Sequence, residues 1–340
     1  MSPRSGIAAR FDQVVNRARR IDVGSVVDRA RAAAKQHHKA SAVVFVDMMI
    51  EAGFHETAFQ DYVDWDFAML NSAERRTFMT HPLSQRLSEQ FDEPAGRLIF
   101  QDKIAFDDKF NEFLGREWLR VESSSVEEVR DFVTRHGRVI GKVPFSNSGH
   151  GVERHEAADV TDWAAFRASL IGKGQTLLEE LIVQHPTLAA ICPGTVNTTR
   201  VTAFFDGQKA QILSMAQKFG RGAASDQQTF GGFYSMLDIA TGRAKGPGYD
   251  SHDNVHLTHP ESGVSIPDFQ LPLFETLQPF MDRLTAVVPT VRYVGWDVVM
   301  GPTGPVVVEG NWAVGVYDNK PSVTGVRTGS RPRFQQVMGF

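Results

Sequence analysis

The sequence has few of the features that mark secreted, membrane or nucleic-acid-binding proteins. Its single cysteine, Cys192, excludes an internal disulfide framework and a cysteine-based zinc site. The longest apolar run, residues 42–50, is broken by Asp47 and falls well short of the roughly 20 residues that a membrane span needs. No hydrophobic signal-peptide core follows Met1, and the net charge of −4 gives no broad basic surface. These absences predict a soluble cytoplasmic protein with no nucleic-acid partner and no membrane span.

The composition that remains is that of an ordinary globular protein of about two domains. The chain has 340 residues, of which 42% are hydrophobic and 22% charged. Residues 1–100 carry apolar side chains at helical spacing, whereas short apolar strands alternate with helices from about residue 120 onward. The strand patterns lie at 139–143, 176–183, 198–205, 210–217, 232–239, 293–300 and 306–310. The sequence therefore predicts an α+β fold that begins with a helical region.

The first 40 residues are basic, with nine Lys and Arg against three Asp. Their apolar residues recur at helical spacing, so they predict a basic amphipathic helix pair. Such a pair could bind a membrane surface, an acidic partner or RNA. It could equally be a solvated helix face that packs on its own domain, and both interpretations stay open.

A hairpin near the C-terminus carries the clearest chemical pattern. Glu309 and Asn311 lie two residues apart on one apolar strand and therefore share a face, and Asp297 lies on the adjoining strand. Three oxygen-bearing side chains on apolar strands are costly unless a cation lies among them. Hard oxygen ligands of this kind suit Mg²⁺ that holds a polyphosphate. The alternative is that the carboxylates face solvent on an edge strand.

Two further segments could contact a nucleotide. Lys142 ends one predicted strand, and the loop after it contains Ser146, Ser148 and Gly149, so an ammonium group and several backbone N–H groups could surround an anion. The loop is not a Walker motif and could be an ordinary hairpin. Glu179 and Glu180 lie within another strand, where they could meet an adenine edge or simply face solvent.

The order of these segments resembles that of the ATP-grasp superfamily: the lysine and glycine loop, then Glu179-Glu180-Leu181-Ile182, then Asp297 followed by Glu309-Gly310-Asn311. The segments Asn197-Thr-Thr-Arg200, His259-Pro-Glu-Ser-Gly263 and Gly295-Trp-Asp297 are similar to its sugar-transfer-associated branch, as is the helical leader. The resemblance spans roughly residues 55–315. It implies an ATP-grasp fold, in which two α+β subdomains at 101–175 and 176–340 clamp ATP and residues 1–100 precede them.

The resemblance also implies a role for individual residues. Lys103 and Lys142 match the two lysines that reach the phosphates of ATP. Glu179 or the Glu180 carbonyl would meet the adenine amino group, the Ile182 N–H a ring nitrogen, and Gln184 or His185 the ribose. Two Mg²⁺ ions would be bound by Asp297, Glu309 and Asn311. Arg200 and Lys218 match cations near the γ-phosphate and the acyl group, and strand alternation predicts that Arg200 points toward the Asp297 hairpin.

The activity implied is that of an ATP-dependent carboxylate–amine ligase. A small-molecule carboxylate would attack ATP to give an acyl phosphate, and an amine substrate would then form an amide or peptide bond. Arg200 would stabilise the oxyanion or hold the carboxylate. Two alternatives remain: an ATP-dependent phosphotransferase on a small-molecule or glycan-linked acceptor, and a non-catalytic nucleotide-binding partner of a glycan-assembly complex.

Overall fold

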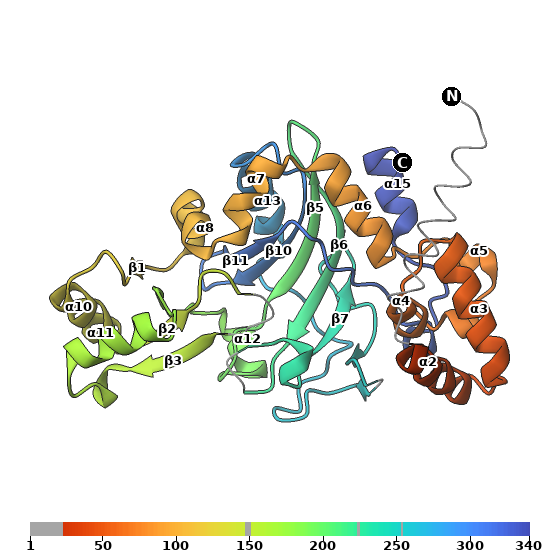
Figure 1. Ribbon diagram of the computed structural model, residues 1–340, viewed down its shortest axis with the longest axis horizontal. Coiled ribbons are helices and arrows are strands. Elements are labelled where there is room, and N and C mark those ends of the chain that lie inside the picture. The colour runs from red at the N-terminus through yellow and green to blue at the C-terminus, as the bar shows by residue number, and fades with distance from the viewer. Residues whose placement is uncertain (1–22, 147–150, 223–224, 253) are drawn as a thin grey trace. The chain divides into compact units, whose positions relative to one another are not determined.

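The computed structural model describes residues 23–146, 151–222, 225–252 and 254–340 (Figure 1). The chain forms two compact units. Unit 1 comprises residues 1–86 and 318–332, and unit 2 comprises residues 87–317 and 333–340. The predicted basic helix at residues 1–22 lies outside the described residues.

Unit 1 is helical throughout its described residues, as the sequence predicts. Its helices are α2 (Val23–Gln36), α3 (Ser41–Phe54), α4 (Phe59–Asp64), η1 (Phe67–Met69), α5 (Ser72–Arg75) and α14 (Pro321–Thr324). Helix α6 (His81–Phe91) runs across the boundary with unit 2. Arg75 stabilises the unit from within, because its guanidinium pairs with Asp47 at 2.7 Å and with Glu51 at 2.9 Å. Helix α5 is capped by Asn71, whose side chain accepts hydrogen bonds from the Ala73 and Glu74 backbone N–H groups.

The first sheet of unit 2 is small and has the strand order β1-β4-β2-β3, with antiparallel neighbours throughout. Its strands are β1 (Trp118–Arg120), β2 (Arg138–Lys142), β3 (Val152–Glu156) and β4 (Leu177–Glu180). Helices α10 (Val126–His136) and α11 (Trp163–Gly172) supply apolar residues to a core with the sheet. Ser125 caps α10 through a Ser-x-x-Glu capping box with Glu128.

The second sheet of unit 2 has the order β11-β10-β5-β6-β7-β8-β9, again with antiparallel neighbours. The strands are β5 (Thr199–Phe205), β6 (Ala210–Phe219), β7 (Phe233–Leu237), β8 (Gly248–Tyr249), β9 (Val255–His256), β10 (Tyr293–Met300) and β11 (Pro305–Asn311). Strands β5 and β6 form a hairpin, and β10 and β11 form the hairpin that the sequence predicts near the C-terminus. Their strands begin within one residue of the predicted starts.

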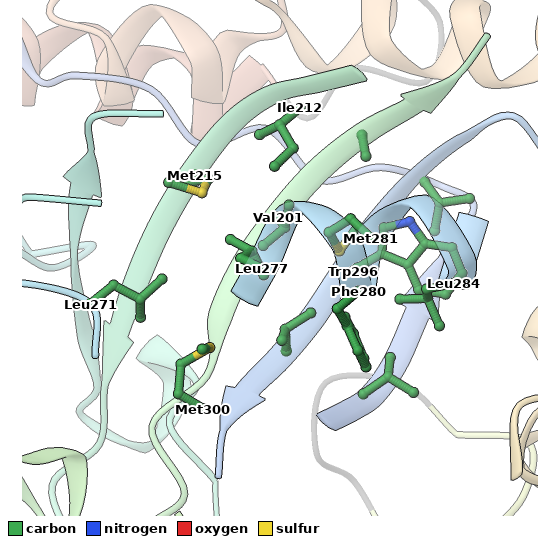
Figure 2. Close-up of a cluster of buried hydrophobic side chains, with 14 of the residues drawn as sticks. Val201, Ile212, Met215, Leu271, Leu277, Phe280, Met281, Leu284, Trp296 and Met300 are labelled. Carbon is green, nitrogen blue, oxygen red and sulfur yellow. The ribbon is translucent and has the colours of Figure 1, made fainter. Parts of the chain in front are cut away.

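One face of the seven-stranded sheet is covered by helix α13 (Leu277–Ala286). Figure 2 shows Leu277, Phe280, Met281 and Leu284 of this helix among side chains of the sheet, including Val201, Trp296 and Met300. These side chains are buried and form the main hydrophobic core of unit 2. Because side chains alternate along a strand, the residues between them, such as Arg200 and Asp297, lie on the opposite face. The core therefore determines which side chains face the candidate site.

The remaining helices of unit 2 are short and connect or cover the sheets. They are α7 (Pro94–Gln101), α8 (Lys103–Lys109), α9 (Asn111–Leu114), η2 (Ala157–Asp159), α12 (Pro186–Ile191), η3 (Gln228–Phe230) and η4 (Phe274–Thr276). Helix α15 (Arg331–Met338) crosses the boundary between the units. Within the described ranges, no helix is both long and apolar enough to cross a membrane. The predicted α+β fold class is confirmed.

Candidate functional site

The site is built around the β10–β11 hairpin, where the predicted oxygen donors come together. Asp297 lies directly opposite Glu309, and Gly295 lies opposite Asn311. The Asn311 amide donates to a Glu309 carboxylate oxygen at 3.3 Å and to the Gly295 carbonyl at 3.3 Å. A β-bulge between Asp297 and Val298 changes the register just beyond this point. The three donors therefore share one face of the hairpin, as the sequence predicts.

Asp297 is also held by two cations from the neighbouring strands. Arg200, its cross-strand partner on β5, donates from Nε at 3.0 Å and from Nη2 at 3.2 Å to its two oxygens. Lys218 of β6 places its Nζ 3.1 Å from the same carboxylate. All three residues are buried, with exposed fractions of 7%, 3% and 2% for Arg200, Lys218 and Asp297. A carboxylate in this position compensates two buried positive charges.

The electrostatics of this group keep all three residues charged. Burial opposes ionisation of Asp297, but Arg200 and Lys218 more than offset that effect, and the pKa of the carboxyl lies below its usual range. Burial likewise opposes the charge on Lys218, yet Asp226 and Asp297 raise the pKa of its ammonium group. Asp226 lies 3.6 Å from Lys218 and accepts hydrogen bonds from the Thr198 backbone N–H and hydroxyl.

The donor set fits a hard cation in its chemistry. It offers two carboxylates, Asp297 and Glu309, and the amide oxygen of Asn311, which are the ligand types that Mg²⁺ takes. Glu309 and Asn311 are partly exposed, so their oxygens can reach a ligand. Within the described part of the chain, including this hairpin with its two carboxylates, no group of three or more His, Cys, Asp or Glu side chains is placed to hold a metal ion.

Two lysines form the other half of the site. Lys103 is the first residue of α8, and its Nζ donates to the Ser146 carbonyl and, at 3.2 Å, to the Ser146 hydroxyl. Lys142 ends β2, and its Nζ lies 2.5 Å from a Glu179 oxygen on the adjacent strand β4. Burial lowers the pKa of Lys103, and the charge of Glu309 partly offsets that effect. This charge interaction connects Lys103 to the hairpin donors.

Glu179 is shared between Lys142 and a second cation, Arg116. Arg116 donates to both Glu179 oxygens, from Nε at 2.9 Å and from Nη2 at 3.2 Å. Its side chain is completely buried and also donates to the β11 carbonyls of Val307, at 2.7 Å, and Val308, at 3.3 Å. Burial disfavours the Glu179 carboxylate, but Arg116 and Lys142 outweigh this and lower its pKa to about 2. Glu179 is therefore ionised at neutral pH.

The residues expected around adenine and ribose follow β4. Glu180 accepts a bond from the Glu117 backbone N–H at 3.0 Å, and Ile182 lies in the irregular segment after the strand. The Gln184 amide is used inside the protein, since it donates to the Cys192 and Thr195 carbonyls and accepts from Asn197. His185 caps α12 by accepting from the Thr187 N–H.

The loop after Lys142 is described only in part. Ser146 is described, and its hydroxyl donates to the Val143 carbonyl at 2.8 Å. The predicted anion-binding residues Ser148 and Gly149 lie outside the described residues.

Sequence reasoning missed three residues of the site: Arg116, Asp226 and Tyr317. The Tyr317 ring lies against Arg200, with the guanidinium carbon 5.4 Å from the ring centroid, and packs on Tyr234 at 4.8 Å. Asp226 holds Lys218, and Arg116 holds Glu179. None of the three lies within a strand or motif that the sequence singles out, so only their long-range partners reveal them.

Comparisons with known proteins identify the family of the chain. The family model described as sugar-transfer associated ATP-grasp matches residues 139–328. No curated protein matches the sequence.

Solved structures of several ligases are similar to the chain at low sequence identity. The ATP-grasp ligase PsnB with its minimal precursor is 15% identical, with a TM-score of 0.44 over 83% of this chain and 77% of that one. D-alanyl-alanine synthetase A from Vibrio cholerae is 15% identical, with a TM-score of 0.42 over 73% and 67%. A Chryseobacterium gregarium RiPP-associated ATP-grasp ligase is 10% identical, with a TM-score of 0.38 over 68% and 60%. Similarity at this level has no bearing on activity.

Proposed function

The chain belongs to the sugar-transfer associated ATP-grasp family, and from that membership we propose that it is an ATP-dependent carboxylate–amine ligase. The observation that carries the proposal is the buried group on one sheet face, where Arg200 and Lys218 flank Asp297 beside Glu309 and Asn311. Such a group combines cations for a transferring phosphoryl group with oxygen donors for a cation. Lys103 and Lys142 add two further ammonium groups.

The reaction has two steps. A carboxylate oxygen of the first substrate attacks the γ-phosphorus of ATP, the bond from that phosphorus to the β,γ-bridging oxygen breaks, and ADP leaves. An amine of the second substrate then attacks the acyl carbon of the acyl phosphate. The carbon–oxygen bond breaks, phosphate leaves with the electron pair, and the amine proton passes to solvent. The protein contributes position and charge, and no covalent enzyme intermediate is needed.

Each half of the site has a role in this scheme. Lys103 and Lys142, with Ser146 and the loop that contains Ser148 and Gly149, bind the phosphates of ATP. Asp297, Glu309 and Asn311 would hold Mg²⁺, which when bound neutralises charge on the phosphates. Arg200 and Lys218 are the catalytic cations near the γ-phosphate and the acyl group. Because Asp297 occupies the Nε and Nη2 edge of Arg200, we expect Nη1 to meet the substrate oxygen.

The contacts of β4 and the segment after it also bear on the adenine and ribose contacts, for each of which the resemblance leaves two candidate residues. The Glu179 carboxylate is taken by Arg116 and Lys142, which supports the Glu180 carbonyl as the acceptor of the adenine amino group. The Ile182 N–H would meet a ring nitrogen. The Gln184 amide makes four hydrogen bonds within the protein, which supports His185 as the residue that contacts the ribose.

The test is to trap the acyl phosphate. The protein is incubated with ATP, Mg²⁺, hydroxylamine and a panel of amino acids, short peptides and other carboxylates, and the products are analysed by mass spectrometry. With the correct carboxylate, we expect a hydroxamate and one ADP for each hydroxamate formed; omission of the carboxylate should remove both. Stable transfer of phosphate to a hydroxyl acceptor would show a phosphotransferase instead. Nucleotide binding without turnover for any acceptor would favour the non-catalytic alternative.

A further inference from the structure

Arg116 occupies an unusual position for a residue that contacts no candidate substrate group. It follows Gly115, whose φ of +59° ends α9 in the left-handed region. A Cβ at Gly115 would lie 2.3 Å from the Val306 side chain, so only glycine fits this turn against β11. The turn brings Arg116 between β4 of the four-stranded sheet and β11 of the seven-stranded sheet.

The bonds of Arg116 fix it more firmly than the lysine that shares its partner. The guanidinium makes two bonds to Glu179 and two to the β11 carbonyls, and none of the side chain is exposed. Lys142 also contacts Glu179, at 2.5 Å, but 13% of its side chain is exposed and it lies at the end of its strand. Glu179 thus has one cationic partner that is fully buried, Arg116, and one that is partly exposed, Lys142.

This difference matters when a nucleotide binds. If Lys142 moves to a phosphate, the Glu179 carboxylate loses one cation while it stays buried, with only 4% of its side chain exposed. A buried carboxylate without a partner is strongly unfavourable. The bidentate bond from Arg116 removes most of that cost, because Glu179 remains paired after Lys142 has left.

We propose that Arg116 is a positioning residue for Lys142: it is the permanent counter-ion of Glu179 and so allows Lys142 to exchange that carboxylate for a phosphate of ATP. The proposal rests on the proposed function, in which Lys142 binds the nucleotide. Asp107, whose carboxyl oxygen lies 3.5 Å from Arg116, is the second acidic group beside this pair; burial and the charge of Glu179 raise its pKa to about 8, and its side chain hydrogen-bonds Glu179.

The proposal makes opposite predictions for the two partners of the bidentate bond. In Arg116→Gln, Lys142 is the remaining cation on Glu179, so the lysine is retained there and ATP affinity falls at least tenfold. In Glu179→Gln, the lysine is released and ATP affinity stays the same or rises. The double variant Arg116→Gln/Glu179→Gln contains neither charge and should recover ATP affinity to within about threefold of the single Glu179→Gln variant.

The experiment measures the dissociation constant of ATP with Mg²⁺ by calorimetry for the full-length protein and these variants, with melting temperatures as a check on folding. Lys142→Ala is the reference and should weaken ATP binding at least tenfold. Arg116→Lys keeps the charge without the fork and should fall between wild type and Arg116→Gln.

The outcomes separate this inference from the proposed function. If Lys142→Ala weakens binding but Arg116→Gln does not, or if the double variant fails to recover, Arg116 has only a structural role and the inference is wrong. If Glu179→Gln alone loses ATP affinity, Glu179 contacts the nucleotide directly and the inference is again wrong. Wild-type affinity in Lys142→Ala would overturn both the inference and the assignment of that lysine to the phosphates. Should Arg116→Gln fail to fold, the Glu179→Gln result decides alone.

Discussion

The backbone of Gly295 lies against the guanidinium of Arg200. A Cβ on Gly295 would come within 2.7 Å of Arg200 Nη1 and 3.3 Å of the Val314 side chain. The register explains the contact, because Gly295 precedes the Asp297 position by two residues and therefore shares its face. The absence of a side chain at this position leaves the room in which Arg200 reaches Asp297, so the glycine is part of the site although it offers no functional group.

The first prediction concerns this contact. Gly295→Ala should displace Arg200 from Asp297 without removing a charge, and a shift of about 1 Å in a catalytic group can cost about 100-fold in rate. We expect at least a tenfold loss of turnover with ATP affinity kept within about threefold. Turnover and nucleotide binding are measured on the same preparation. The matched control is Gly172→Ala, since a Cβ at that helical position meets nothing within 4 Å; equal losses in both variants would refute the prediction.

Substitution of Asp297 should destabilise the protein more than substitution of Glu309, although both residues belong to the same proposed set of metal ligands. Asp297→Asn leaves Arg200 and Lys218 buried without their shared carboxylate, which typically costs about 3–5 kcal/mol. Glu309 is partly exposed, so Glu309→Gln should change stability far less. Both variants should lose ATP turnover. Thermal unfolding and ADP release test this pair of expectations.

The exposed Asp108→Asn variant serves as a control for the loss of one carboxylate at the surface. It should keep both stability and turnover. Equal melting temperatures for Asp297→Asn and Glu309→Gln would contradict the role of Asp297 as a counter-ion. Full turnover in either variant would remove that residue from the site.

The sequence could predict this half of the site because its information is local. Alternation along two apolar strands joined by a short turn puts Asp297, Glu309 and Asn311 on one face, and the same alternation along β5 puts Arg200 on the face opposite Val201. The core then settles which face is which, since Val201 and Trp296 are buried against α13. The hairpin at β5–β6 follows from its turn for the same reason.

The rest could not be predicted because its partners are distant in the chain. Arg116 bonds Glu179 from 63 residues away and Val307 from 191 residues away, and nothing near Arg116 marks it as buried. The grouping of residues 318–332 with the N-terminal helices is equally non-local. The sequence also cannot show that two cations share Asp297, since that requires the register of β5 and β6 together. Local patterns thus predict the strands and the face on which each side chain lies, whereas tertiary packing determines which charged side chains pair with each other.

Arg200→Lys tests whether the shape of the cation matters. Lysine keeps a positive charge but has a single ammonium group, so it cannot make both bonds to Asp297 and also place a donor where Nη1 lies. We expect ATP binding within about threefold of wild type and a loss of product formation of at least tenfold. Arg120→Lys, at an exposed ion pair, is the control and should change neither ATP binding nor product formation. Wild-type product formation in Arg200→Lys would exclude a role for the guanidinium geometry.

The last prediction concerns the pH dependence of stability and depends on Asp92. Its Oδ1 accepts a bond from the Tyr293 backbone N–H at 2.8 Å, whereas its buried Oδ2 has no partner among the described residues. Burial raises the pKa of this carboxyl to about 7 from an ordinary value of 3.8. The folded protein therefore binds a proton that the unfolded chain releases between these values, so the contribution to stability is full below about pH 4 and is lost as the pH rises through 7.

Asp92→Asn mimics the protonated carboxyl at every pH and should flatten this dependence. Between pH 5 and pH 8, the wild type should lose up to about 3 kcal/mol of stability that the variant keeps, because about two pKa units of the difference fall within this range. Melting temperatures of both proteins, measured across that range, give the comparison, and Asp108→Asn at the surface should follow the wild type. A variant whose melting temperature falls as steeply with pH as that of the wild type would mean that Asp92 is already ionised in the folded protein at pH 5. In that case, the backbone hydrogen bonds from Tyr293 and Arg292 would be enough to hold the buried carboxylate.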